Sequence, residues 1–230
     1  MSHGERSALL QILRCSQPVS ALEVGTAHGG SLEQIRQFAQ LTYSIDIDPG
    51  VRTRLAPEMP NVEFLTGDSA ELIGVALQRC AERRQPPGFA LIDGDHRYAG
   101  VQADIHALLR HQPSCPLWVL LHDSTNPECR RGIAEARWGD NPHVHLVDLD
   151  FVTGTTSNDA HLEGQMWGGL ALALLLPEPR GGALEIAASA SKNFRVLYGA
   201  SVHSPISWQH WRQILLSKWG GVRRRLGRWR

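Results

Sequence analysis

The feature of this sequence that most restricts its fold is the alternation of short apolar runs with amphipathic segments. The runs predict buried strands, and the segments between them have apolar residues at helical spacing. The expected strands are 21–24, 43–47, 62–65, 89–92 and 117–121, and the expected helices are 5–15, 31–40, 51–55, 69–83, 98–111 and 127–137. Strands that alternate with helices in this way predict a mostly parallel sheet with helices on both faces.

Two further apolar runs, 144–151 and 169–176, lack an intervening helix long enough for a parallel crossover. They are therefore expected to pair antiparallel. The predicted fold is α/β: a Rossmann-like, seven-stranded, mostly parallel sheet with an antiparallel last strand and helices on both faces. Residues 201–205 are expected to begin a final helix. The chain has 230 residues and no low-complexity tract, so it can bury one full core.

Two of the expected strands end in clusters of polar residues. Residues 90–96 read Ala-Leu-Ile-Asp-Gly-Asp-His, and residues 117–124 read Leu-Trp-Val-Leu-Leu-His-Asp-Ser. Open α/β proteins place their chemistry at the edge of the sheet where the carboxyl ends of the strands lie. We therefore expect Asp93 and His96 to form a reaction centre, and the two strand ends to converge on one ion or substrate.

A glycine-rich turn, Glu-Val-Gly-Thr-Ala-His-Gly-Gly from residue 23, follows the first strand and precedes a helix. It either serves chain reversal alone or lets a ligand approach the backbone. Asp46 follows about 20 positions beyond the loop, a spacing suited to binding ribose hydroxyls, which favours the ligand. At the end of the third strand, Asp68 either meets an adenine edge or caps the helix that begins near Ser69.

Five motifs in this order resemble those of class I S-adenosylmethionine-dependent methyltransferases. They are Glu-x-Gly-x-x-x-Gly-Gly from residue 23, Asp-x-Asp-Pro from 46, Gly-Asp-Ser from 67, Asp-Gly-Asp-His-x-Tyr-x-x-Val-x-x-Asp from 93 and Leu-His-Asp-Ser from 121. The resemblance covers residues 20 to 176. It is closest to the metal-assisted O-methyltransferases related to catechol and macrolide-sugar methyltransferases.

The resemblance implies a role for each matching residue. Those that correspond to cofactor-binding residues are Glu23, Gly25, Thr26, Gly29, Asp46, Asp68, Ser69 and Asp93. Asp93 also corresponds to a ligand of a divalent metal ion, and the further ligands correspond to Asp123 and Ser124. Serine is a poorer ligand than the Asn or Asp of these relatives, and His122 and Asp95 are the candidates to compensate for it.

The chemistry of methyl transfer agrees with these roles. The acceptor oxygen must be aligned with the sulfonium methyl group, and a metal ion on that oxygen lowers its pKa and fixes its position. Mg²⁺ prefers carboxylates and water, which Asp93 and Asp123 offer. His96 corresponds to the base that deprotonates the acceptor hydroxyl. The alternative for His96 is a residue at a helix N-terminus that bonds only to its own turn.

Composition predicts a cytoplasmic protein. The sequence shows no leader, and its longest apolar run is far shorter than the roughly 20 residues of a membrane-spanning helix. The four cysteines form no Cys-x-x-Cys pair, which is typical of buried thiols in a reducing compartment. No recognition motif accompanies the arginines, so we expect no nucleic-acid partner.

Residues 201–230 are expected to form a separate Trp/Arg-rich helix and tail beyond a methyltransferase domain of residues 1–200. They contain seven basic residues and no acidic one, whereas residues 1–200 have seven more acidic than basic residues. A basic segment with Trp at helical spacing from residue 208 is suited to a protein partner or to the anionic inner face of a membrane. The alternative is a docked helix with a solvated tail.

The leading hypothesis is an S-adenosylmethionine-dependent O-methyltransferase. Its acceptor would be a hydroxyl of a small molecule, such as a sugar or secondary metabolite, with a divalent metal, Mg²⁺, and His96 as general base. A second hypothesis is a catalytically silent, cofactor-binding subunit tethered by its basic tail, and a third is another reaction on the same scaffold. Residues 152–165 are expected to form a loop over the site, and Trp167 either stacks on the acceptor or packs in the core. The oligomeric state stays open.

Overall fold

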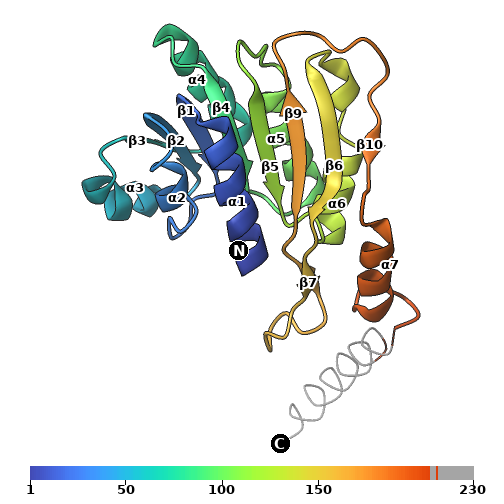
Figure 1. Cartoon of the computed structure of the whole chain (residues 1–230). Coiled ribbons are helices and arrows are strands. Elements are labelled where there is room, and N and C mark those ends of the chain that lie inside the picture. The colour runs from blue at the N-terminus through green and yellow to red at the C-terminus, as the bar shows by residue number, and fades with distance from the viewer. Residues whose placement is uncertain (208–210, 212–230) are drawn as a thin grey trace, which may run out of the picture.

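The expected strands form one sheet in the computed structural model of the chain, which describes residues 1–207 and 211. Its order is β10-β6-β9-β5-β4-β1-β2-β3 (Figure 1). The parallel strands predicted from the sequence are β1 (Ser20–Val24), β2 (Leu41–Asp46), β3 (Val62–Thr66), β4 (Pro87–Ile92) and β5 (Leu117–His122). The predicted mostly parallel α/β sheet is confirmed.

The part of the sheet next to β5 is antiparallel, as expected. Strand β9 (Leu170–Leu175) lies between β5 and β6 (Val144–Val152) and runs antiparallel to both. The two-residue strand β10 (Ile186–Ala187) pairs with β6 and adds an eighth strand that was not predicted. A short hairpin of β7 (Thr155–Thr156) and β8 (Met166–Trp167) projects from the carboxyl edge of the sheet (Figure 1).

Helices cover both faces of the sheet (Figure 1). Helix α1 (His3–Ser16) packs its buried residues Leu9 and Leu13 against Phe89 and Leu120, together with residues of α2 (Leu32–Ile35). The opposite face is covered by α4 (Ser69–Glu82), α5 (Tyr98–Leu108) and α6 (Pro127–Ala134). Each fully buried Leu contributes about 1.5–3 kcal/mol, so α1 is a stable part of the fold. The remaining helices are α3 (Pro49–Leu55), α7 (Ser191–Ala200), and the short 3₁₀ turns Ala56–Glu58 and Trp138–Asp140.

Three expectations are wrong in detail. The helix expected at 31–40 is only four residues long, and Ser31 makes no side-chain capping bond to it. Residues 201–207 form turns and bends instead of beginning a helix, and α7 was not predicted. All four cysteines are free, as expected, but Cys15 is exposed rather than buried.

Among the described residues, no helix combines the length and apolarity needed to cross a membrane. Trp211 is described and is 54% exposed. The rest of the predicted Trp/Arg-rich segment, 208–210 and 212–230, lies outside the described residues.

Candidate active site

A cavity of about 920 Å³ lies at the carboxyl ends of β1 to β5 and along one side of α5. Seven of the predicted site residues line it: Gly25, Asp46, Asp68, Ser69, Asp93, His96 and Asp123. The other four, Glu23, Thr26, Gly29 and Ser124, are buried and do not line it. The volume is within the range of small-molecule sites. The parallel topology therefore gathers most of the predicted residues around one cavity.

The glycine-rich turn after β1 needs its first glycine. Gly25 has a φ of +81°, a left-handed conformation that L side chains rarely adopt. A Cβ at this position would overlap the backbone carbonyl oxygen of Asp93 at the end of β4. The absence of a side chain at Gly25 thus lets the ends of β1 and β4 lie side by side at the cavity.

Asp46 shapes this turn from the neighbouring strand. Its Oδ2 accepts hydrogen bonds from the backbone N–H groups of Thr26 and Ala27, at 3.0 and 2.9 Å. Its Oδ1 accepts one from the N–H of Asp48 at 2.8 Å. The carboxylate at the end of β2 therefore fixes the glycine turn and also faces the cavity. The exposed side chain of Ile47, which the sequence analysis did not single out, lines the cavity beside it.

Glu23 supports the turn from the interior. The Thr26 hydroxyl donates to Glu23 Oε2 at 2.9 Å, while Glu23 Oε1 has no hydrogen-bond partner. Burial raises the pKa of Glu23 to about 8. The carboxyl group is therefore mostly protonated at neutral pH, because a buried charge without a cation beside it is unfavourable.

Asp68 is the N-cap of α4, with its Oδ1 accepting from the N–H of Ala70 at 2.9 Å, and it also lines the cavity. The hydroxyl of Ser69 donates to Oδ1 of Asp104 at 2.5 Å. Burial raises the pKa of Asp104 to about 6. Asp104 ends the fourth sequence motif and lines the cavity, although no role was predicted for it.

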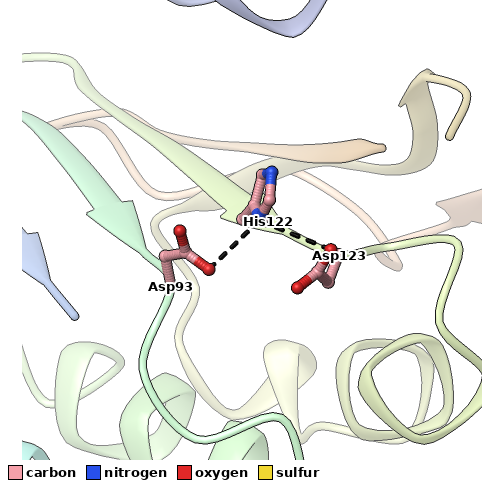
Figure 2. A group of neighbouring side chains, drawn as sticks. All are labelled: Asp93, His122 and Asp123. Carbon is pink, nitrogen blue, oxygen red and sulfur yellow. Dashed lines mark hydrogen bonds and ion pairs between the residues drawn. The ribbon is translucent and has the colours of Figure 1, made fainter. Parts of the chain in front are cut away.

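Two histidines and two aspartates meet at the ends of β4 and β5 (Figure 2 draws three of them). His122 Nδ1 lies 3.1 Å from Asp93 Oδ1 and 3.5 Å from Asp123 Oδ1. His96 Nε2 lies 3.0 Å from Asp123 Oδ2 and 3.5 Å from Asp93 Oδ1. The two strand ends therefore converge as predicted, with His122 as an additional central member.

The backbone conformation of Asp123 explains how the side chains of the adjacent residues His122 and Asp123 can lie next to each other. Successive side chains of a strand point to opposite faces of the sheet. Asp123 follows the last residue of β5 and has a φ of +55°, a left-handed value that few non-glycine residues adopt. This turn brings the carboxylate of Asp123 beside the ring of His122. Such local strain is often found at functional sites.

A buried acid from the N-terminal helix completes the cluster, and the sequence analysis missed it. Glu5 Oε2 lies 3.6 Å from His122 Nε2 and also accepts a hydrogen bond from the N–H of Ser2. Glu5 Oε1 accepts from the N–H of Gly169 at 2.5 Å. The only sequence signal is the pair Ser2 and Glu5, which forms a capping box and gives no hint of a contact with the site.

Hydrogen bonds within the cluster keep both histidines charged. Asp123 and Asp93 raise the pKa of His96 to about 10. Burial opposes a charge on His122, but its contacts with Asp123, Asp93 and Glu5 raise its pKa to about 12. The same contacts outweigh burial and hold the pKa of Asp123 below its usual range. Three carboxylates thus face two imidazolium groups, and the site is negative and attracts cations.

The donor set fits a metal ion. Asp93, His122 and Asp123 each offer one ligand atom, and the three atoms lie within 4.8 Å of one another. Of the candidates for the third ligand, Asp95 is bound to the guanidinium of Arg97, at 2.6 Å. Ser124 has a buried hydroxyl without a hydrogen-bond partner, away from the cavity. The geometry therefore favours His122 as the residue that compensates for Ser124.

The β7–β8 hairpin is attached to this cluster. The N–H of Gly168 donates to Asp123 Oδ1 at 2.6 Å, and the rings of Trp167 and His96 meet edge to face at 5.5 Å. Trp167 is only half-buried. Its ring therefore borders the cluster of His96, His122 and the aspartates and is not enclosed in the core.

Known proteins share this architecture. Residues 22–124 match the sequence model of a family described as a methyltransferase domain. The O-methyltransferase TomG from Streptomyces achromogenes, involved in tomaymycin synthesis and solved with S-adenosylmethionine, is 16% identical, with a TM-score of 0.56 over 76% of this chain and 81% of TomG. An O-methyltransferase from Bacillus cereus, solved with S-adenosylhomocysteine, is 14% identical, with a TM-score of 0.55 over 76% of this chain and 82% of its own. No curated protein matches the sequence.

Residues 22–124 are thus similar to a methyltransferase domain, and the fold of the chain is similar to that of the two O-methyltransferases.

Proposed function

We propose that this protein transfers the methyl group of S-adenosylmethionine to a hydroxyl of a small molecule, assisted by a divalent metal ion. The observation that carries the proposal is the single cavity that joins the glycine turn and Asp46 to the cluster of Asp93, His96 and Asp123. The O-methyltransferases from B. cereus and S. achromogenes support it, because they combine a similar fold with cofactor binding.

The cofactor would lie across the ends of β1 to β4. Asp46 faces the cavity and is suited to accept hydrogen bonds from the ribose hydroxyls. Ile47 is 80% exposed and offers an apolar surface that an adenine ring would cover. Asp68 and Ser69 line the same end of the cavity and provide oxygen acceptors for the base. The negative cluster at the other end suits a sulfonium cation.

The acceptor would bind where Asp93, His96 and Asp123 meet, next to the β7–β8 hairpin. A divalent ion held by Asp93, Asp123 and His122 would supply positive charge that lowers the pKa of the acceptor hydroxyl. The carboxylates of Asp93 and Asp123 keep His96 protonated, and a divalent ion that neutralises them would let His96 Nε2 lose its proton and become the proposed proton acceptor. Trp167 beside His96 would limit the position of the acceptor and exclude water.

Calorimetric titration with S-adenosylhomocysteine tests the cofactor site, with wild type, Asp46→Ala and His96→Ala compared. We expect Asp46→Ala to weaken binding, because the variant loses the ribose acceptor and the support of the glycine turn. His96→Ala should bind the cofactor nearly as wild type does. A folded wild-type protein that does not bind S-adenosylhomocysteine would contradict the proposal.

A screen of hydroxylated acceptors with labelled S-adenosylmethionine tests the reaction. Wild type should transfer label to oxygen, and His96→Ala should lose this turnover while it retains the cofactor. His106→Ala is the matched control, since His106 lies on α5 and bonds the N–H of Arg137 outside the cavity. Transfer to nitrogen acceptors alone would contradict the proposed O-methylation.

A further inference from the structure

His122 presents its two ring nitrogens to two different sets of carboxylates. Nδ1 faces Asp93 and Asp123, whereas Nε2 faces only Glu5, at 3.6 Å. Nε2 is buried and has no partner at hydrogen-bond distance. The ring therefore connects the cavity side of the cluster with a carboxylate on its far side.

Glu5 is fixed in place on that far side. Its side chain is only 3% exposed, and its two oxygens accept from the backbone N–H groups of Gly169 and Ser2. A Cβ at Gly168 would lie 2.7 Å from Glu5 Oε1, so the carboxylate has little room to move. A rigid carboxylate behind a histidine fixes the orientation and the tautomer of the ring, as in carboxylate–histidine–metal arrangements.

We propose that His122, oriented by Glu5, is the third protein ligand of the metal ion, and that the site prefers a transition metal such as Mn²⁺ to Mg²⁺. This inference rests on the proposed function for the location of the ion between Asp93 and Asp123. The Glu5 carboxylate, 3.6 Å from Nε2, favours the tautomer with its proton on Nε2. The lone pair of Nδ1 is then directed at the two aspartates, where a bound ion would take the place of the Nδ1 proton. One imidazole and two carboxylates suit Mn²⁺ or Fe²⁺, whereas Mg²⁺ takes oxygen ligands and water.

In this assignment Glu5 is a positioning residue and not a ligand. Loss of the Glu5 carboxylate should weaken the binding of metal ions that take an imidazole ligand, such as Mn²⁺. It should leave the affinity for the cofactor unchanged. Glu5 belongs to α1, outside the residues that match the methyltransferase family, so nothing in the motifs assigns it this role.

The test measures the binding of Mn²⁺ and Mg²⁺ to the full chain by calorimetry, with bound Mn²⁺ also followed by electron paramagnetic resonance. The variants are Glu5→Gln and His122→Asn, and the control is Ser2→Ala. The control removes the hydroxyl that caps α1 at the N–H of Glu5 but leaves the Glu5 carboxylate facing His122. Circular dichroism and affinity for S-adenosylhomocysteine check that each variant is folded.

We expect wild type and Ser2→Ala to bind Mn²⁺ more tightly than Mg²⁺ by roughly tenfold or more. Glu5→Gln should weaken Mn²⁺ binding by about 10- to 100-fold, the usual effect of losing an outer-shell partner. His122→Asn replaces the imidazole by an amide oxygen and should remove the preference for Mn²⁺.

Equal affinity of wild type for the two ions, or unchanged Mn²⁺ binding in both variants, would overturn the proposal. Wild type that binds S-adenosylhomocysteine but neither ion would also overturn it and leave the cofactor site standing. Failure to bind S-adenosylhomocysteine as well would instead contradict the proposed function. If Glu5→Gln does not fold, His122→Asn decides the outcome.

Discussion

Gly25→Ala is the substitution for which the structure makes the sharpest prediction. An alanine there has to adopt the left-handed φ of +81°, which costs about 1–2 kcal/mol for an L residue. Its Cβ also overlaps the carbonyl oxygen of Asp93, which belongs to the backbone and cannot rotate away. Overpacking of this kind costs about 1–3 kcal/mol. We therefore expect a total destabilisation of about 3 kcal/mol.

Gly30→Ala is the matched control in the same turn. Gly30 has no left-handed φ, and a Cβ at Gly30 would meet no atom within 4 Å. Its substitution should change stability by no more than about 0.5 kcal/mol. For a chain of this length, 3 kcal/mol corresponds to a decrease in Tm of about 10 °C.

Thermal and urea unfolding of the two variants measure this difference. Gly25→Ala should also bind S-adenosylhomocysteine more weakly, because the displaced β1 and β4 ends line the cavity. Two variants with melting temperatures within about 2 °C of each other would refute the reasoning. Such a result would mean that the end of β4 moves aside at little energetic cost.

Three further changes test other parts of the structure. Glu23 has a folded-state pKa raised by burial to about 8, so the folded state takes up a proton and wild-type stability falls as pH rises through that window. In urea titrations, the free energy of unfolding of Glu23→Gln minus that of wild type should therefore increase by about 3 kcal/mol between about pH 5 and pH 7.5. A difference that does not change with pH would contradict this. Arg130→Ala should lower the free energy of unfolding by about 3 kcal/mol in the same assay, because it leaves buried Asp150 without its cation. The control Arg131→Ala removes an exposed ion pair and should lower it by less than about 1 kcal/mol. Equal losses in the two variants would argue against the buried pair. Asp46→Asn should accelerate proteolysis of the glycine turn, because the carboxylate that binds two of its N–H groups is lost, and an unchanged cleavage rate would contradict that role.

The strands were predictable because local pattern decides them. Short apolar runs were sufficient to locate the strands. Their directions followed from the rule that joins alternating strands and helices into a parallel sheet, and from the lack of a long helix between 144–151 and 169–176. The helix expected at 31–40 failed for a tertiary reason. The side-chain amide of Asn61 donates to the carbonyls of Arg36 and Ala39, at 2.8 and 3.2 Å, and so stabilises a turn where a helix would continue.

Helix α7 was missed for a similar reason. Its start is fixed by Asp150, whose Oδ2 accepts from the N–H of Ala190 at 3.1 Å, and Phe194 packs under the guanidinium of Arg130 at 4.0 Å. Both partners are far away in the sequence. The local sequence of α7 has no side-chain N-cap that would have marked its beginning.

The candidate site was predictable where it follows strand ends, and unpredictable where it does not. Asp93, His96 and Asp123 follow strands β4 and β5, so topology alone brings them together. Glu5 lies on α1, which packs on one face of the sheet. Its contact with His122 therefore depends on how α1 docks on that face. No periodicity or spacing in residues 3–16 encodes that approach.

The docking of α1 has a consequence for how the protein matures. Residues from β4 and β5 can meet as soon as the sheet forms, but Glu5 arrives only when α1 covers its face of the sheet. A chain with α1 still undocked would already have the glycine turn and the aspartates, yet it would lack the carboxylate behind His122. Completion of the cluster therefore depends on α1 covering its face of the sheet, and a truncated form that begins at β1 would lack the carboxylate that faces His122 Nε2.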